Sequence, residues 1–226
     1  MKKIVQIELT NACNRSCTYC GIPTMTRKKA FMTQATFSRC VDVLQELGQD
    51  EVGINHYGES TMHPKYVEFI RQLNDKGIKP FIYTNGDFLT DELIAELATC
   101  KLKFLIISGH MLMEERVALW EKCQVAGIAE SYYQVTLTEQ NTLSLAGQRL
   151  VGVDAGETPL IDPQNHCRFL VEEMAVVLVN GDLTPCCVDY DGKGVFGSIF
   201  NFDVAKQKTP AFSLCDTCPG HPGNVV

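Results

Sequence analysis

Residues 9–20, LTNACNRSCTYC, begin at the end of an apolar, strand-like run at residues 4–9. They carry three cysteines, Cys13, Cys17 and Cys20, in the spacing C-x3-C-x2-C. Three thiolates on one short loop can hold three corners of a [4Fe–4S] cluster, which leaves the fourth iron without a protein ligand. Considered alone, the same residues also suit a zinc site or a redox-active C-x2-C pair.

The spacing, with the aromatic Tyr19 just before the third cysteine, resembles the radical S-adenosylmethionine (radical SAM) superfamily. This resemblance implies that SAM binds the open iron through its amino and carboxylate groups. It also implies that the reduced cluster cleaves SAM to methionine and a 5′-deoxyadenosyl radical, which takes a hydrogen atom from the substrate. Cys13, Cys17 and Cys20 are therefore the expected metal ligands and catalytic residues.

Composition narrows the class of protein. The chain has 226 residues, of which 45% are hydrophobic, so a folded core is expected. The net charge of −7 disfavours a nucleic-acid binder. No apolar run is long enough to span a membrane, and Glu8 and Asn11 interrupt the first apolar run too early for a signal peptide. A cytoplasmic protein without nucleic-acid or membrane partners is therefore expected.

The cysteine count supports metal binding. Eleven cysteines without an export signal favour metal ligation over a disulfide framework. The isolated Cys40, Cys100 and Cys123 lie in or at the ends of helical patterns, so we expect them to be packed thiols.

Strand-like and helix-like segments alternate along the first 150 residues, which predicts parallel βαβ units and an α/β fold. Right-handed crossovers curl such units into an open or closed barrel. The resemblance implies a partial (β/α)5-6 barrel at residues 1–150. The chain is expected either to stop at five strands or to place a sixth within residues 148–153. The expected strands are residues 4–9, 51–56, 80–84, 103–108 and 131–137, and the expected helices are 33–47, 64–77, 90–99 and 113–123.

A second, smaller domain is expected at residues 151–226. Asn180-Gly181 lies between two β-like runs and predicts a hairpin turn. Four cysteines surround this hairpin, and taken alone they suit zinc as well as an iron–sulfur cluster. Their C-x13-G-x4-C spacing resembles the SPASM and twitch auxiliary domains, which implies a second [4Fe–4S] cluster per chain. The implied ligands are Cys167, Cys186, Cys215 and Cys218, and Cys187 is a possible replacement for Cys186.

Short motifs follow each expected strand, where the functional loops of parallel α/β folds gather. Gly58-Glu59 follows the second strand and resembles the family motif that binds the SAM amino group. Thr84-Asn85-Gly86 follows the third strand and resembles the segment near the SAM ribose and carboxylate. Each motif alone is ordinary turn chemistry, and the prediction depends on their common order. The expected SAM contacts are Tyr19, Gly58, Glu59, Ser60, Thr84, Asn85, Ser108 and Gln134.

The sequence indicates the substrate-binding residues less clearly than the SAM contacts. His56 and His110 end two strands and could face the substrate, and His110 and Arg149 are the candidate catalytic residues beyond the cysteines. Arg149 and Arg168 could hold a polar substrate by hydrogen bonds. His63-Pro64 is expected to start a helix.

A basic segment could serve a redox partner. Residues 27–29 (Arg-Lys-Lys) lie beside the cysteine loop of an acidic protein. They could dock an acidic electron donor such as flavodoxin or ferredoxin, or form a solvated loop.

These observations predict a radical SAM oxidoreductase. The expected reaction is a two-electron oxidation of a small polar metabolite, with the auxiliary cluster as electron acceptor. Modification of a peptide or protein substrate, as a maturase or crosslinking enzyme, is the alternative, and a redox-neutral outcome is also open. A hypothesis from a different class of protein is a non-catalytic iron–sulfur carrier or a zinc-stabilised binding module.

Overall fold

The computed structural model describes residues 1–17, 20–108, 111–133, 142–145, 148–151, 167–203, 208–213 and 215. Its large sheet has the strand order β10-β9-β8-β1-β2-β3-β4-β5. The strands from β8 through β5 pair in parallel, which confirms the α/β fold with a partial barrel. The strands are β1 (Lys3–Ile7), β2 (Glu51–Gly53), β3 (Lys79–Thr84), β4 (Phe104–Ile107), β5 (Ser131–Tyr133), β8 (Met174–Val177), β9 (Asp182–Thr184) and β10 (Gly197–Ser198).

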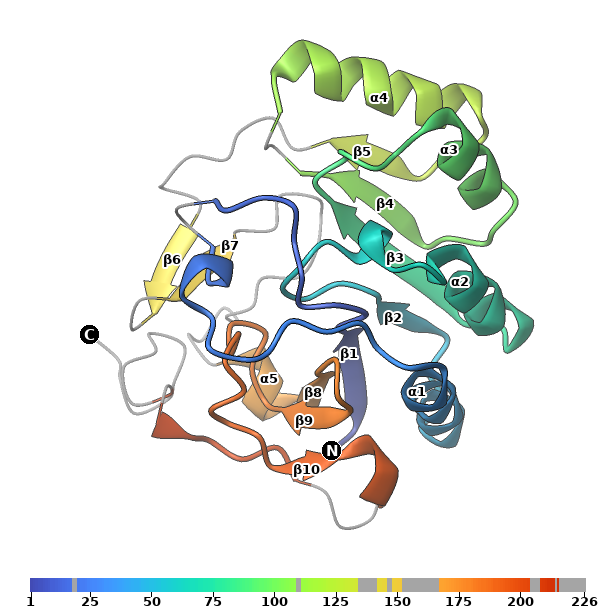
Figure 1. Ribbon diagram of the computed structural model, residues 1–226. Helices are drawn as coiled ribbons and strands as arrows, with labels where there is room; N and C mark the ends of the chain where they lie inside the picture. Colours follow the sequence, from blue (N-terminus) through green and yellow to red (C-terminus); the bar gives the residue numbers. More distant parts are fainter. Residues whose placement is uncertain are drawn as a thin grey trace.

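Helices α1 to α4 cover one face of this sheet, which we call the outer face (Figure 1). Thr33 and Thr90 start α1 and α3 with side chains that accept hydrogen bonds from backbone N–H groups of the first turn. The helices and turns are α1 (Gln34–Glu46), α2 (Tyr66–Asp75), α3 (Asp91–Ala98), α4 (Met113–Val125), α5 (Arg168–Val171), η1 (Ile22–Thr24), η2 (Ser60–Met62) and η4 (Ile199–Asn201).

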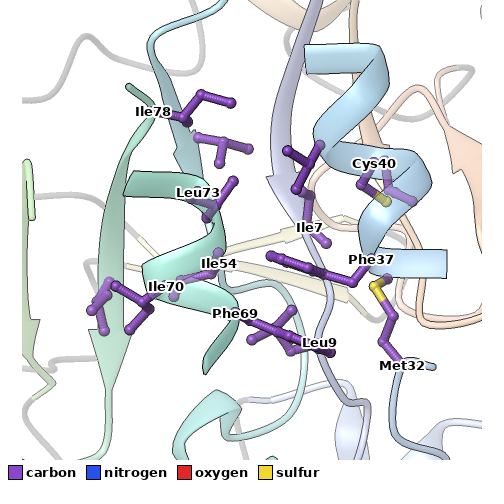
Figure 2. Packing of buried hydrophobic residues seen from close by; sticks show 14 of the residues in the cluster. Ile7, Leu9, Met32, Phe37, Cys40, Ile54, Phe69, Ile70, Leu73 and Ile78 are labelled. Carbon is purple, nitrogen blue, oxygen red and sulfur yellow. The ribbon is translucent and has the colours of Figure 1, made fainter. Parts of the chain in front are cut away.

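The main hydrophobic core lies between the sheet and these helices. Phe37 of α1 stacks on Phe69 of α2 with ring centroids 4.0 Å apart, and Ile7 of β1 is packed beside them (Figure 2). Full burial of such side chains stabilises the fold by about 1.5–3 kcal/mol each. Within the described residues, no helix is long and apolar enough to cross a membrane.

The expected sixth barrel strand is in a different place. The sequence leaves two alternatives, a barrel of five strands or a sixth strand within residues 148–153, and both are wrong. Strand β7 (Gln148–Val151) pairs antiparallel with β6 (Thr142–Leu145) in a separate sheet. The sixth parallel strand is β8, which pairs with β1. All four β8 residues are buried, which is typical of a strand covered on both faces.

Strand β8 also forms the expected hairpin. It pairs antiparallel with β9, and Gly181 in the turn has φ +92°, a conformation that glycine adopts readily. The barrel and the hairpin therefore share one continuous sheet. The division at residue 150 into two domains remains a prediction.

Candidate functional site

The cysteine loop begins where β1 ends, at the carboxyl edge of the parallel strands. Cys13, Cys17 and Cys20 are all partly buried. The Cys20 N–H donates to the Cys17 carbonyl over 3.0 Å, and the Arg15 N–H donates to Cys13 Sγ over 3.4 Å. The loop thus holds its thiols near its own backbone, within reach of a ligand.

The loop after β2 packs directly on the cysteine loop. Gly58 has φ +95°, and a Cβ at this position would lie 2.2 Å from the Thr10 carbonyl oxygen. The Glu59 N–H donates to the Ala12 carbonyl over 2.8 Å. Only glycine permits so close an approach of the two backbones, so residue 58 fixes the distance between the cysteines and Glu59.

Glu59 is buried and held by four hydrogen bonds. Its Oε1 accepts from Thr84 Oγ1 at 2.8 Å, and from the Thr61 hydroxyl at 2.6 Å and N–H at 3.2 Å. Its Oε2 accepts from the Asn85 N–H at 2.7 Å. A carboxylate has about four acceptor sites, so Oε2 retains capacity for a cationic or N–H ligand.

The loop after β3 joins the same network. Asn85 Nδ2 donates to Asn14 Oδ1 over 2.8 Å and faces Cys13 Sγ at 3.9 Å. Asp87 accepts from Arg15 and Asn14 of the cysteine loop. The predicted motifs after β1, β2 and β3 are therefore brought together, and the Arg15–Asp87 pair is a contact that sequence reasoning missed.

The donor set fits an iron–sulfur ligand site. Burial raises the pKa of the Cys13 and Cys20 thiols, and the neighbouring thiols raise it further. A bound cationic metal deprotonates its thiol ligands outright, so thiols that the free protein holds protonated become thiolates when the metal binds. In the described part of the chain, no three His, Cys, Asp or Glu side chains already converge as metal ligands.

The structure describes some of the other expected SAM contacts and not others. Ser60 is buried at the start of η2, and the Ser108 N–H donates to the Thr84 carbonyl over 2.8 Å. Both residues therefore adjoin the Glu59 network. Tyr19 and Gln134 lie outside the described residues, as does His110.

The second cysteine group lies around α5 and the β8–β9 hairpin. Cys167 and Cys187 pack on one apolar cluster that includes Phe169. Cys186 and Cys187 pack beside Val188 and Phe212, and the Phe212 N–H donates to Cys215 Sγ over 3.5 Å. The Cys187 thiol and burial raise the pKa of Cys186 well above its ordinary value. Cys218 lies outside the described residues.

A segment that sequence reasoning missed joins the two cysteine groups. The ring of Tyr190 covers Gly21, and its hydroxyl accepts from Thr24 Oγ1 at 3.0 Å. Asp191 Oδ1 accepts from the Thr26 N–H at 2.7 Å. Residues 190–191 therefore hold the end of the cysteine loop against the C-terminal hairpin region.

The basic segment at residues 27–29 is not a uniform surface patch. Arg27 donates two hydrogen bonds of 2.7 Å to Glu8, whose side chain is fully buried. Lys28 and Lys29 are exposed. Docking of an electron donor remains a prediction, and only the two lysines are available for it.

The remaining candidates divide between structural and undetermined roles. Both ring nitrogens of His63 are used, because Nε2 lies 2.9 Å from the Met32 carbonyl and Nδ1 accepts from the Lys65 N–H. His63 thus shapes the segment before α2, which begins at Tyr66 and not at His63-Pro64 as expected. Arg168 pairs with Glu172 within and just after α5. Arg149 lies on β7, and its side chain is outside what the structure describes.

The isolated cysteines behave as packed thiols. Cys40 and Cys123 are buried in the main core. Burial raises the pKa of Cys123 to about 11 and raises that of Cys40 as well. Cys100 is partly buried and its Sγ donates to the Glu96 carbonyl at 3.5 Å.

The sequence of the chain is similar to a known protein family and to a characterised enzyme. The model of the Radical SAM superfamily matches residues 7–132, which is more than half of the chain. The S-adenosyl-L-methionine-dependent 2-deoxy-scyllo-inosamine dehydrogenase of Niallia circulans is 25% identical over 201 residues, covering 87% of this chain and 78% of that protein.

Solved structures show the same fold. BtrN in complex with AdoMet and 2-DOIA superposes with a TM-score of 0.72 at 21% identity, covering 91% of this chain and 81% of that one. Streptococcus suis SuiB bound to the precursor peptide SuiA gives a TM-score of 0.64 at 12% identity, covering 97% and 70%. The partial barrel is thus found both in a complex with 2-DOIA and in a complex with a peptide.

Proposed function

Because the chain belongs to the radical SAM superfamily, we propose that it oxidises a small polar metabolite by two electrons. Cys13, Cys17 and Cys20 would hold the [4Fe–4S] cluster at which SAM binds. When bound, the cluster and SAM supply the hydrogen-atom abstraction that starts the reaction. The observation that carries the proposal is the network in which Glu59 is fixed beside the cysteine loop by Thr84 and the Asn85 backbone.

Glu59 would bind the amino group of SAM. Among the described residues its Oε2 accepts one hydrogen bond, from the Asn85 N–H, whereas Oε1 accepts three. A fixed, buried carboxylate oxygen is a strong acceptor for an N–H donor. Because Thr61, Thr84 and Asn85 set its position before the ligand arrives, little ordering is needed when SAM binds.

The dehydrogenase of Niallia circulans supports the oxidative outcome, since it aligns with 87% of this chain. Oxidation of an alcohol to a carbonyl removes a hydrogen atom from carbon, followed by a proton and an electron. We propose that Cys167, Cys186, Cys215 and Cys218 would hold a second cluster that accepts this electron. Four thiolate ligands leave no open iron, which suits electron transfer better than substrate binding.

The test is anaerobic reconstitution with an iron and sulfide count, followed by SAM and dithionite. About eight irons per chain are expected, falling to about four in the Cys13/Cys17/Cys20→Ala variant. Release of 5′-deoxyadenosine is expected from the unmutated chain only. Bound zinc, or a fully loaded chain that cleaves no SAM, would contradict the proposal. About four irons in the unmutated chain, with SAM cleaved, would remove the second cluster and the preference for oxidation.

A substrate panel separates the two substrate classes. 2-Deoxy-scyllo-inosamine represents the small metabolites, and short peptides represent the substrates suggested by the SuiB complex. An oxidised product from the inosamine, formed in step with 5′-deoxyadenosine, would support the proposal. Oxidation of peptides alone would replace it with the peptide-modifying alternative.

A further inference from the structure

The inner face of the sheet, opposite α1 to α4, carries polar side chains beside the Glu59 network. Val52 and Ile54 pack into the core on the outer face, so Gly53 and Asn55 point to the inner face. Gln6 is the direct partner of Gly53 across the β1–β2 pair. Paired residues in neighbouring strands share a face, and Gln6 therefore lies on the inner face beside Asn55.

Polar atoms of Gln6, Asn55 and the neighbouring His56 lack partners within the described part of the chain. Gln6 Oε1, Asn55 Oδ1 and both ring nitrogens of His56 are buried with no hydrogen-bond partner among the described residues. The Asn55 side chain folds back over Gly53, because its Oδ1 lies 2.6 Å from the place where a Cβ of residue 53 would sit. The absence of a side chain at Gly53 is what admits this amide to the inner face.

Such groups lower the stability of the free protein. A buried polar atom without a partner has lost its water and gained nothing in return, and native proteins contain few of them. Gln6 lies on β1, and Asn55 and His56 lie just after β2, the strand beside it. His56 comes two residues before Gly58 and three before Glu59. A ligand that supplies the missing hydrogen bonds accounts for their presence together.

The charges around His56 indicate what that ligand carries. Burial lowers the pKa of His56 and so favours the neutral ring. The carboxylates of Glu8 and Asp189 act in the opposite direction, and the Arg27 guanidinium, which is paired with Glu8, acts with burial. The backbone of Asp189 also favours the protonated ring, although no hydrogen bond of good geometry forms there. Two carboxylates against one guanidinium leave an excess of negative charge, which suits an amine.

We propose that Gln6, Asn55 and His56 form the substrate subsite and that it binds an amino-bearing polyol. The two amide oxygens need hydroxyl or amine donors, and the imidazole can accept from one hydroxyl and donate to another. This inference rests on the proposed function, since it places the substrate beside the SAM site. It adds which residues recognise the substrate and which chemical groups they select.

The test is calorimetric titration of the anaerobically reconstituted, unreduced chain with 2-deoxy-scyllo-inosamine, with and without SAM. Asn55→Leu, Gln6→Met and His56→Phe each remove hydrogen-bonding atoms while keeping much of the volume. Each is expected to weaken inosamine binding about tenfold, to leave SAM affinity unchanged, and to keep or raise Tm. Myo-inositol, which lacks the amine, is expected to bind more weakly than the inosamine.

Tyr66→Phe is the matched control. The Tyr66 hydroxyl is also buried without a hydrogen-bond partner among the described residues, but it lies in the core on the outer face. Its removal is expected to keep or raise Tm and to leave inosamine binding unchanged. A structural role for Gln6, Asn55 and His56 would instead lower Tm in their variants and leave inosamine affinity as it was.

The outcomes separate this inference from the proposed function. Unchanged inosamine binding in all three variants, or binding of peptides but of neither polyol, would overturn the subsite even if SAM is cleaved. Weakened inosamine binding in the variants of a chain that cleaves no SAM would uphold the subsite and refute the proposed function.

Discussion

Two neighbouring polar regions of this protein differ in how their hydrogen bonds are satisfied. Glu59 accepts four hydrogen bonds from the protein, whereas the polar atoms of Gln6, Asn55 and His56 named above have no partner among the described residues. The first region is fixed in advance by the chain itself. The second region leaves its hydrogen-bonding capacity for a ligand. The first arrangement suits SAM, which the proposed function places beside Glu59. The second suits a substrate that is specific to this protein.

Gly58→Ala is expected to have the largest effect, because it breaks the fixed region. The new Cβ would lie 2.2 Å from the Thr10 carbonyl oxygen at a position with φ +95°. The loop must move away from the cysteines, at a cost of about 3 kcal/mol in the free energy of unfolding. Thermal unfolding measures the loss, and SAM affinity is expected to fall with it.

Gly48→Ala is the control for this substitution. Gly48 also has a positive φ, +66°, but nothing lies within 4 Å of the place where its Cβ would sit. Its cost is expected to be about 1 kcal/mol, from the backbone conformation alone. Equal costs for the two variants would show that the contact with the cysteine loop has no part in the effect.

Glu59→Gln is expected to have an intermediate effect. Both carboxylate oxygens accept from a backbone N–H, Oε1 from Thr61 and Oε2 from Asn85. A glutamine amide must therefore place its own donor against one of them, in whichever orientation it takes. The expected loss is about 2 kcal/mol of stability, with SAM bound at least tenfold more weakly.

Glu51→Gln provides the comparison at the surface. Glu51 pairs with Lys3 at 3.1 Å and also with Lys103, and its side chain is 29% exposed. Removing its charge is expected to change stability by at most about 1 kcal/mol and SAM affinity not at all. A Glu59→Gln variant as stable as Glu51→Gln would contradict the fixed network.

The smallest expected effect concerns pH and the unpartnered region. Burial lowers the pKa of His56 below the ordinary 6.5, against the opposing carboxylates of Glu8 and Asp189 and in the same direction as Arg27. Below about pH 6.5 the unfolded chain therefore binds a proton that the folded chain does not, and stability falls as pH falls. His63, whose pKa burial also lowers, contributes in the same direction.

Tm measured from pH 7.5 to 5.5 tests this prediction. His56→Phe removes one of the two groups, so its Tm is expected to fall less steeply than that of the unmutated chain. Identical slopes would show that folding leaves the pKa of His56 unchanged. A steeper fall in His56→Phe would show that the fold favours the protonated ring, which would favour a carboxylate-bearing ligand over an amine.

Much of the fold could be predicted because it depends on local patterns. Thr33 and Thr90 precede runs of helical periodicity and cap α1 and α3, and Asn180-Gly181 forms the turn between β8 and β9. The sixth strand could not be located, because β7 and β8 both have strand-like sequences. Which of them pairs with β1 depends on contacts between residues about 170 positions apart.

The residues alone were enough to predict the cysteine loop, the order of the motifs after each strand, and the family to which the chain belongs. These properties depend on residue type and spacing along the chain. Tertiary contacts were needed to show that Glu59 is held by Thr84 and Asn85 and that Arg27 is paired with buried Glu8. They also show that buried polar atoms of Gln6, Asn55 and His56 have no partner among the described residues. A hydrogen bond depends on where two distant segments meet in space, and no local pattern records that position.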